Sequence, residues 1–194
     1  MMRSAICFVI ALSACGGRSP ATSGAGTGTP GQSGLVAFET VRSVLQHPRC
    51  QNCHPRDDMP LQGDDGRPHN QNVQRGPDGH GMVGERCSTC HGPANPPASY
   101  GEHAPPGVST GWRMPKPEER LVFVGVAPGA LCEQIKDPAR NGGKDMAALR
   151  AHLDDPLVVW AWSPGLGRKP PPVSRQAFLD AWTAWANAGA PCPK

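Results

Sequence analysis

Large apolar side chains are scarce in this sequence. Only 38% of its 194 residues are hydrophobic and only 5% are aromatic, whereas it contains 24 glycines and 23 prolines. A chain with so little apolar surface builds a thin core and usually needs disulfides, a metal or a bulky cofactor to fold stably. The composition therefore predicts support of this kind, and eight cysteines could provide it.

The sequence also lacks a strong net charge and the usual signatures of a substrate site. Its formal charge is +3, and its lysines and arginines are scattered. Because nucleic-acid binding requires a concentrated basic surface, we expect no nucleic-acid partner. The sequence contains no dinucleotide fingerprint, no paired carboxylates at a telling spacing and no nucleophile beside a base. Nothing in it therefore predicts binding of an organic substrate.

Hydrophobic runs of membrane-spanning length are missing. The apolar stretch SAICFVIALSA, residues 4–14, follows a basic start and is too short to span a bilayer, so residues 1–14 are interpreted as a signal peptide. The stretch leads into LSAC, which resembles the lipobox of bacterial lipoproteins and predicts lipidation of Cys15. An ordinary signal peptide is the alternative. Gly16 after the cysteine favours the outer membrane, so we expect an exported protein anchored by lipid at the periplasmic face of that membrane.

Apolar periodicity begins only after residue 34. Residues 15–34 are almost all small or turn-forming, which predicts a flexible tether, and the folded domain is expected over residues 35–194. Phe38, Val41, Val44 and Leu45 then follow a helical spacing.

Strand signals are rare in the rest of the chain. Further helices are predicted over residues 128–137, 145–154 and 175–188, the last with Ser174 as N-cap. Residues 55–117 are rich in glycine, proline, asparagine and aspartate, which predicts loop. The apolar segments 121–126 and 157–162 are short enough to be either buried extended pieces or helix ends. The predicted fold class is mainly α, with long loops.

Two cysteine motifs repeat: CQNCH at residues 50–54 and CSTCH at 87–91. Two cysteines at this spacing can form a disulfide, bind zinc, or form thioethers to the vinyl groups of a haem. The histidine that follows favours haem, because the thioethers place the porphyrin against the backbone and the next imidazole then reaches the iron. We therefore predict two haem c groups, with His54 and His91 as the proximal iron ligands. The predicted thioether residues are Cys50, Cys53, Cys87 and Cys90.

Two alternatives use the same four cysteines. They could form a four-thiolate zinc site or a disulfide framework. Neither explains the two histidines, and free structural thiolates are uncommon in an exported protein.

The remaining cysteines also have expected fates. Cys7 leaves with the signal peptide and Cys15 takes lipid, which leaves Cys132 and Cys192. In an oxidising compartment this pair is expected to form a disulfide; two buried free thiols are the alternative.

Whether each iron has a sixth protein ligand separates a carrier from an enzyme. The candidate distal ligands are His69, His103, Met114 and His152. His69 follows the first motif by 15 residues, and His103 follows the second by 12. His47 and His80 are interpreted as solvated residues.

Several segments together resemble a known family. They are PLQGDD, VQRGPDG, CSTCHG, LCEQIKDPARNGG, HLDDPLVVWAWSPGLGR and AGAPCP. With the two motifs, they make residues 40–193 similar to small proteobacterial dihaem c-type cytochromes, some of which are labelled as subunits of isoquinoline 1-oxidoreductase. The resemblance implies cytochrome-c-like helices with long loops around two covalent haems. Arg113 stands where relatives are expected to have histidine, so no ligand role is transferred to it.

The expected function is electron transfer. The two haems would pass single electrons to or from a redox partner protein, such as a periplasmic dehydrogenase. One alternative is a peroxidase-like haem enzyme in which one iron has an open position. The other is a cytochrome subunit docked on a larger oxidoreductase.

Overall fold

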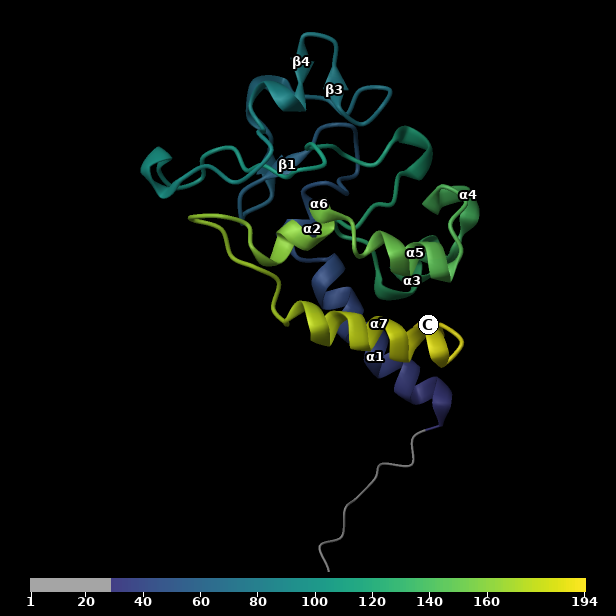
Figure 1. Cartoon of the computed structure of the whole chain (residues 1–194). Helices are drawn as coiled ribbons and strands as arrows, with labels where there is room; N and C mark the ends of the chain where they lie inside the picture. Colours follow the sequence, from purple (N-terminus) through teal and green to yellow (C-terminus); the bar gives the residue numbers. More distant parts are fainter. Residues whose placement is uncertain (1–28) are drawn as a thin grey trace, which may run out of the picture.

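The computed structural model describes residues 29–194 and is partly helical, with long loops (Figure 1). Helices account for 43% of these residues and strands for 5%, which is compatible with the expected mainly α class. The signal peptide, Cys15 and most of the tether predicted from the sequence lie outside the described residues. Within residues 29–194 no helix has the length and hydropathy needed to cross a membrane.

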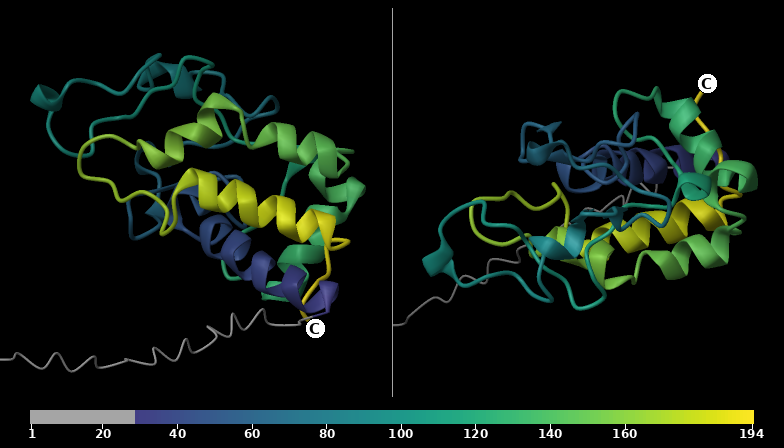
Figure 2. Two further views of the ribbon diagram at one scale, coloured as in Figure 1. Left: turned by 60° about the horizontal axis from the view of Figure 1, so that its bottom comes forward. Right: turned by 90° about the horizontal axis from the view of Figure 1, so that it is seen from above.

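Two long helices form the base of the fold and lie side by side in both views of Figure 2: α1 (Pro30–Leu45) and α7 (Arg175–Asn187). The apolar stripe predicted for α1 is buried, and the Phe38 ring lies 5.1 Å from the ring of Trp185 on α7. The hydroxyl of Ser174 accepts a hydrogen bond from the backbone N–H of Ala177, so the predicted N-cap of α7 is confirmed.

α1 begins at Pro30, five residues before the expected start of the folded domain. Residues 30–34, which were expected to belong to the tether, are therefore helical. Proline suits the first position of a helix because its φ angle is already helical. Gly34 is buried, and a Cβ there would lie 2.7 Å from both Ala188 and Pro191. Glycine at this position therefore permits close packing against the end of α7. Composition alone had suggested that it belongs to a flexible segment.

Five shorter helices complete the fold. They are α2 (Pro48–Gln51), α3 (Pro128–Lys136), α4 (Pro138–Asn141), α5 (Met146–His152) and α6 (Pro156–Val159). α3 and α5 confirm the helices predicted over residues 128–137 and 145–154. Residues 157–162 are helical rather than extended, because Asp155 caps the N–H of Leu157 and Pro156 starts the turn. Residues 121–126 form neither helix nor strand, although Leu121 and Phe123 are buried.

The segment predicted as loop, residues 55–117, is mostly irregular. Its regular pieces are the hairpins β1 (Leu61–Gln62) with β2 (Arg67–Pro68) and β3 (Gly81–Met82) with β4 (Glu85–Arg86), and short 3-10 turns. Arg75 is 2% exposed and holds the loops together. Its guanidinium donates to the carbonyls of Asp57 and Pro115 and to the carboxylate of Asp58. A buried hydrogen-bonded cation thus connects loop segments that lack apolar side chains.

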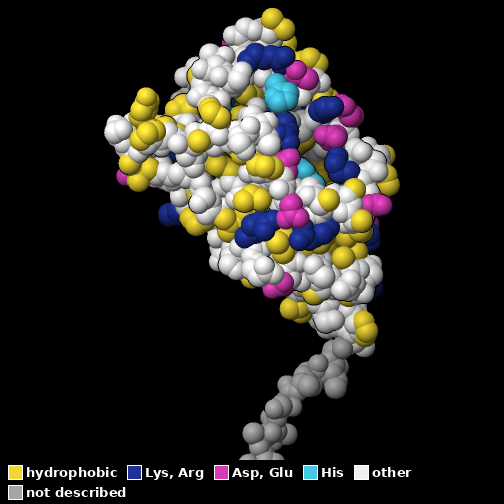
Figure 3. Space-filling model, in the orientation of Figure 1, with side chains coloured by type: hydrophobic (Ala, Val, Ile, Leu, Met, Phe, Trp, Pro, Cys, Tyr) yellow, Lys and Arg dark blue, Asp and Glu magenta, His cyan; other side chains and the backbone are white. Residues whose placement is uncertain are grey.

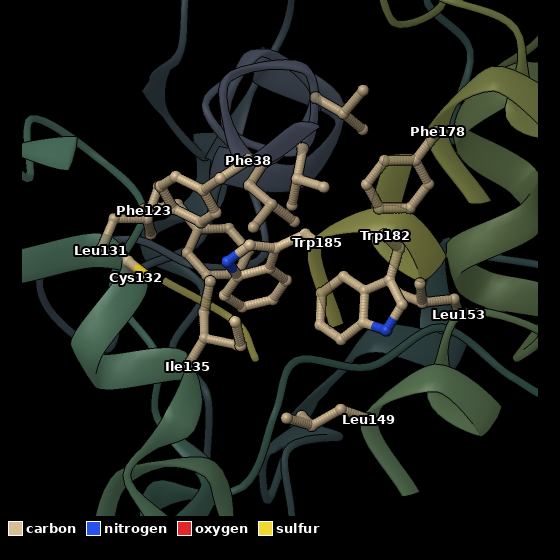
Figure 4. Packing of buried hydrophobic residues seen from close by; sticks show 14 of the residues in the cluster. Phe38, Phe123, Leu131, Cys132, Ile135, Leu149, Leu153, Phe178, Trp182 and Trp185 are labelled. Carbon is tan, nitrogen blue, oxygen red and sulfur yellow. The ribbon is translucent and has the colours of Figure 1, made fainter. Parts of the chain in front are cut away.

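The hydrophobic core lies between α1, α7, α3 and α5, with Trp185 at its centre (Figure 4). The indole N–H of Trp185 donates to the carbonyl of Pro191 over 3.0 Å. Cys132 on α3 and Cys192 in the C-terminal tail form a disulfide, with Cα atoms 5.5 Å apart. These two connections hold the tail against the core.

We expect replacement of Trp185 by alanine to lower the free energy of unfolding by about 3–5 kcal/mol, because the side chain is fully buried and its neighbours can only partly collapse into the space. Urea denaturation followed by circular dichroism measures the change. The matched control is Tyr100→Ala, since Tyr100 is 75% exposed and should change stability by less than about 0.5 kcal/mol. Equal losses in the two variants would contradict the position of Trp185 at the centre of the core.

Candidate functional site

The first CxxCH motif forms a single helical turn that begins at α2. Pro48 occupies the first helical position, and the Nδ1 atom of His47 accepts from the N–H of Arg49. The backbone N–H groups of Cys53 and His54 then donate to the carbonyl of Cys50, over 3.2 and 3.1 Å. The turn places both cysteines and the histidine within one short helical segment.

The second motif repeats this geometry on the 3-10 turn η2 (Cys87–Thr89). The N–H groups of Cys90 and His91 donate to the carbonyl of Cys87, over 3.2 and 2.9 Å. The two motifs thus agree in backbone hydrogen bonding as well as in sequence, although they lie in different surroundings.

The two motif histidines are oriented in the same way. His54 Nδ1 lies 3.0 Å from the carbonyl of Leu121, and His91 Nδ1 lies 2.7 Å from the carbonyl of Pro106. A carbonyl only accepts hydrogen bonds, so each Nδ1 carries the proton and each Nε2 has a free lone pair. Histidines that bind metals are held in this manner.

Each imidazole is also packed against an aromatic ring. Phe123 stacks on His54 at 4.1 Å between ring centroids, and Trp112 stacks on His91 at 4.6 Å. The stacked rings restrict rotation of the imidazoles.

Burial controls the ionisation of both motifs. It lowers the pKa of His54 and of His91 to about 4, against a smaller opposing effect of their carbonyl hydrogen bonds, so both rings are neutral at pH 7. Burial also raises the pKa of Cys50 to about 12 and that of Cys53 to about 11, where nearby Cys87 is the second cause. Thiolates are therefore disfavoured in the first motif, which does not suit a redox dithiol.

The lowered histidine pKa values predict how stability depends on pH. In the unfolded chain the imidazoles have their ordinary pKa near 6.5, so between about pH 6.5 and pH 4 they bind protons mainly when unfolded. Stability should be fully present above pH 6.5 and fall as the pH drops, by at most about 1.4 kcal/mol per pH unit for each histidine. Urea denaturation of the chain without bound haem at pH 7 and pH 5 measures this, and equal or greater stability at pH 5 would contradict it.

A cavity of about 420 Å³ lies next to the first motif. Cys50, Cys53 and His54 line it together with core side chains such as Phe123 and Trp182. The volume is within the range of cavities that bind cofactors in proteins. The first motif thus faces a large, mostly apolar space.

Two buried hydrogen-bond donors at this cavity lack partners among residues 29–194. They are Nε of Arg49, a residue 6% exposed, and Nε1 of Trp182, a residue 3% exposed, and both residues line the cavity. A buried donor without an acceptor costs about 1–3 kcal/mol, so natural proteins rarely keep one without a use. The cavity is therefore suited to an apolar group that also has acceptor oxygens.

Charged residues accompany the apolar lining. Arg113 pairs with Asp155 at 2.5 Å and Lys144 pairs with Glu119 at 2.9 Å, and all four residues line the cavity. In Figure 3 basic and acidic side chains are interspersed on this face, with histidine side chains among them. The lining thus combines apolar side chains with charged side chains that are paired with one another.

The structure distributes the candidate distal ligands between the two motifs. Met114, 5% exposed, and His152 line the cavity of the first motif. His69, which is closer to the first motif in sequence, lies beside the second: its ring centroid is 6.2 Å from that of His91. His103 is exposed and does not line the cavity.

Sequence reasoning missed several residues of the first site. His80, interpreted as solvated, is half-buried and lines the cavity, and so does Arg49. The available signal was an arginine before each motif, Arg49 and Arg86. Only Arg49 is buried, whereas Arg86 is exposed and pairs with Asp78.

The alternative uses of the four motif cysteines find no support in the geometry. None of the four is in a disulfide in the described part of the chain. Over the same residues, no three histidine, cysteine, aspartate or glutamate side chains converge as a four-thiolate zinc site would require.

A continuous set of contacts links the two motifs. Trp112, stacked on His91, meets Trp160 edge to face at 4.7 Å. The guanidinium of Arg49, next to Cys50, lies 6.0 Å from the centroid of Trp160. The motifs are therefore parts of one site region.

No protein-family model, curated protein or solved structure matches this chain, so the region is interpreted from its own geometry.

Proposed function

We propose that the protein is an electron-transfer protein that holds two c-type haems. The observation that supports this most is the repetition of one local geometry. In each motif, two cysteines precede a histidine, and the backbone N–H of this histidine donates to the carbonyl of the first cysteine. The Nδ1 atom of the histidine lies at hydrogen-bond distance from another backbone carbonyl, and its ring stacks on an aromatic residue. This arrangement presents a neutral Nε2 beside two thiols, as covalent haem attachment needs.

The residues around the first motif fit a haem. Cys50 and Cys53 would hold it by thioethers, His54 would be the proximal ligand, and the apolar cavity would accommodate the macrocycle. Thioethers are uncharged, which agrees with a site whose burial disfavours thiolates. The donors of Arg49 and Trp182 that lack partners within residues 29–194 are compatible with a bound group that has acceptor oxygens.

The second haem would be held by Cys87, Cys90 and His91. When bound, the haems supply one-electron chemistry. The chain's own residues exclude water from the first site, keep His54 and His91 neutral and oriented, and connect the sites through Trp112, Trp160 and Arg49. Two centres in contact through packed side chains suit transfer of single electrons within the chain.

We also propose the cellular context expected from the sequence. A disulfide between Cys132 and Cys192 is typical of an exported protein, which supports export through the signal peptide. The lipid anchor at Cys15 is proposed from the lipobox-like sequence LSAC. The partner would be a redox protein such as a periplasmic dehydrogenase, and the chain would join the dihaem cytochromes that it resembles.

The proposal is tested by measuring haem in the mature protein. Pyridine haemochrome spectra and the intact mass should give two covalent haems per chain, and both haems should be reduced and reoxidised reversibly. A colourless protein whose mass is polypeptide plus lipid alone would exclude the proposal. Reoxidation of the reduced protein by hydrogen peroxide with catalytic turnover would instead favour the peroxidase-like alternative.

A further inference from the structure

The rings of His69 and His91 lie at the spacing that two ligands of one metal ion would have. Their ring centroids are 6.2 Å apart and the ring planes make an angle of 55°. Two imidazoles that bind one iron from opposite sides, with Fe–N bonds of about 2.0 Å, have centroids about 6 Å apart. We infer that His69 is the sixth ligand of the second iron, opposite His91. This inference rests on the proposed function, because it assumes a haem at the second motif.

Hydrogen bonding distinguishes His69 from the other candidate histidines. The sequence contains seven histidines, all within residues 29–194. In this part of the chain, only three have Nδ1 within hydrogen-bond distance of a backbone carbonyl: the two motif histidines and His69, whose Nδ1 lies 2.7 Å from the carbonyl of Asn70. As in the motifs, this contact leaves the Nε2 lone pair of His69 free to bind a metal.

Two backbone hydrogen bonds fix the hairpin that leads to His69. The N–H of Leu61, at the start of the β1–β2 hairpin, donates to the carbonyl of Asn52 in the first motif. Directly after the hairpin, the N–H of His69 donates to the carbonyl of Pro60. Gln71 and Asn72 then adopt positive φ angles of 62° and 53°, which costs energy in residues other than glycine. His69 is thus presented by an anchored hairpin rather than by a free loop.

The first centre differs in the ligands within its reach. Met114 is buried and lines its cavity, and its N–H donates to the carbonyl of Gly79 over 2.9 Å. His152 lines the same cavity but has no ring hydrogen bond within residues 29–194. A centre with two imidazoles has a lower reduction potential than one with a thioether ligand. His69 would therefore lower the potential of the second haem.

The test compares His69→Ala with His103→Ala in the full-length protein. Both variants remove one histidine, but His103 is exposed and its ring has no hydrogen bond within residues 29–194. In His69→Ala we expect two covalent haems, of which one becomes high-spin and binds carbon monoxide when reduced. Added imidazole should return it to the low-spin state. His103→Ala should keep the visible and electron paramagnetic resonance spectra of the unchanged protein.

A second variant keeps the inference testable if His69→Ala folds poorly. His69→Met should hold both haems low-spin, raise the reduction potential of one and leave the other unchanged. Two low-spin haems in His69→Ala, with no carbon monoxide binding, would overturn the ligand assignment while leaving the proposed function standing. A His69 variant and an unchanged protein that both lack covalent haem would overturn the proposed function itself.

Discussion

Replacing Cys50 and Cys53 together by alanine is expected to reduce the covalent haem from two to one per chain and to destabilise the fold strongly. The first motif lines the 420 Å³ cavity, and core residues that include Phe178 and Trp182 line it too. Without its haem these side chains would lose their packing partner, and core cavities reduce stability in proportion to their volume. Pyridine haemochrome spectra measure the haem content, and urea denaturation measures the stability.

The matched control is the double replacement of Cys87 and Cys90 by alanine. It should also leave one haem per chain, but the loss of stability should be smaller, because Cys90 is exposed and neither cysteine lines the cavity. Two haems in either double variant would mean that these cysteines do not hold them. A larger destabilisation in the second variant would contradict the central position of the first site.

Replacing Cys132 and Cys192 together by alanine is expected to lower the free energy of unfolding by about 4 kcal/mol. The disulfide closes a loop with a sequence separation of 60 residues, and a cross-link of that span restricts the unfolded chain by about this amount. The C-terminal tail would also be held less firmly against Trp185, which donates to the carbonyl of Pro191. Urea denaturation under oxidising conditions measures the difference.

Reduction of the unchanged protein provides the control for this effect. After reduction of the disulfide, the unchanged chain should unfold at the same urea concentration as the double-alanine variant, and the haem content of both should remain at two. If the variant kept the full stability of the oxidised protein, the disulfide would contribute nothing to the fold.

Local patterns predicted much of the helical structure. The apolar stripe of α1 and the Ser174 cap of α7 depend on neighbours three or four residues away, so the sequence displays them directly. The same locality explains the error at Gly34 and the two alternatives left open for residues 157–162. The packing of Gly34 against Pro191 involves residues far away in the chain, and a short apolar segment can be helical or extended.

The residues of the candidate site also differ in how far the sequence could predict them. The motif cysteines and histidines could be proposed as a site from the sequence because the pattern is contained in five consecutive residues. His69 was related to the first motif by its sequence distance, whereas the β1–β2 hairpin brings it beside His91. The roles of Arg49 and His80 depend on which residues surround a cavity, and no pattern in the sequence reports that.

The β1–β2 hairpin has a consequence for how the two centres influence each other. Its first residue, Leu61, donates a hydrogen bond to the carbonyl of Asn52 inside the first motif. Its last residue, Pro68, precedes His69, which lies beside His91 of the second motif. In the proposed dihaem protein, a change that shifts the first turn is therefore expected to alter how readily the second iron exchanges the proposed sixth ligand. Thermodynamic reciprocity requires the same coupling free energy in the opposite direction, so the occupancy of either centre should alter ligand binding at the other.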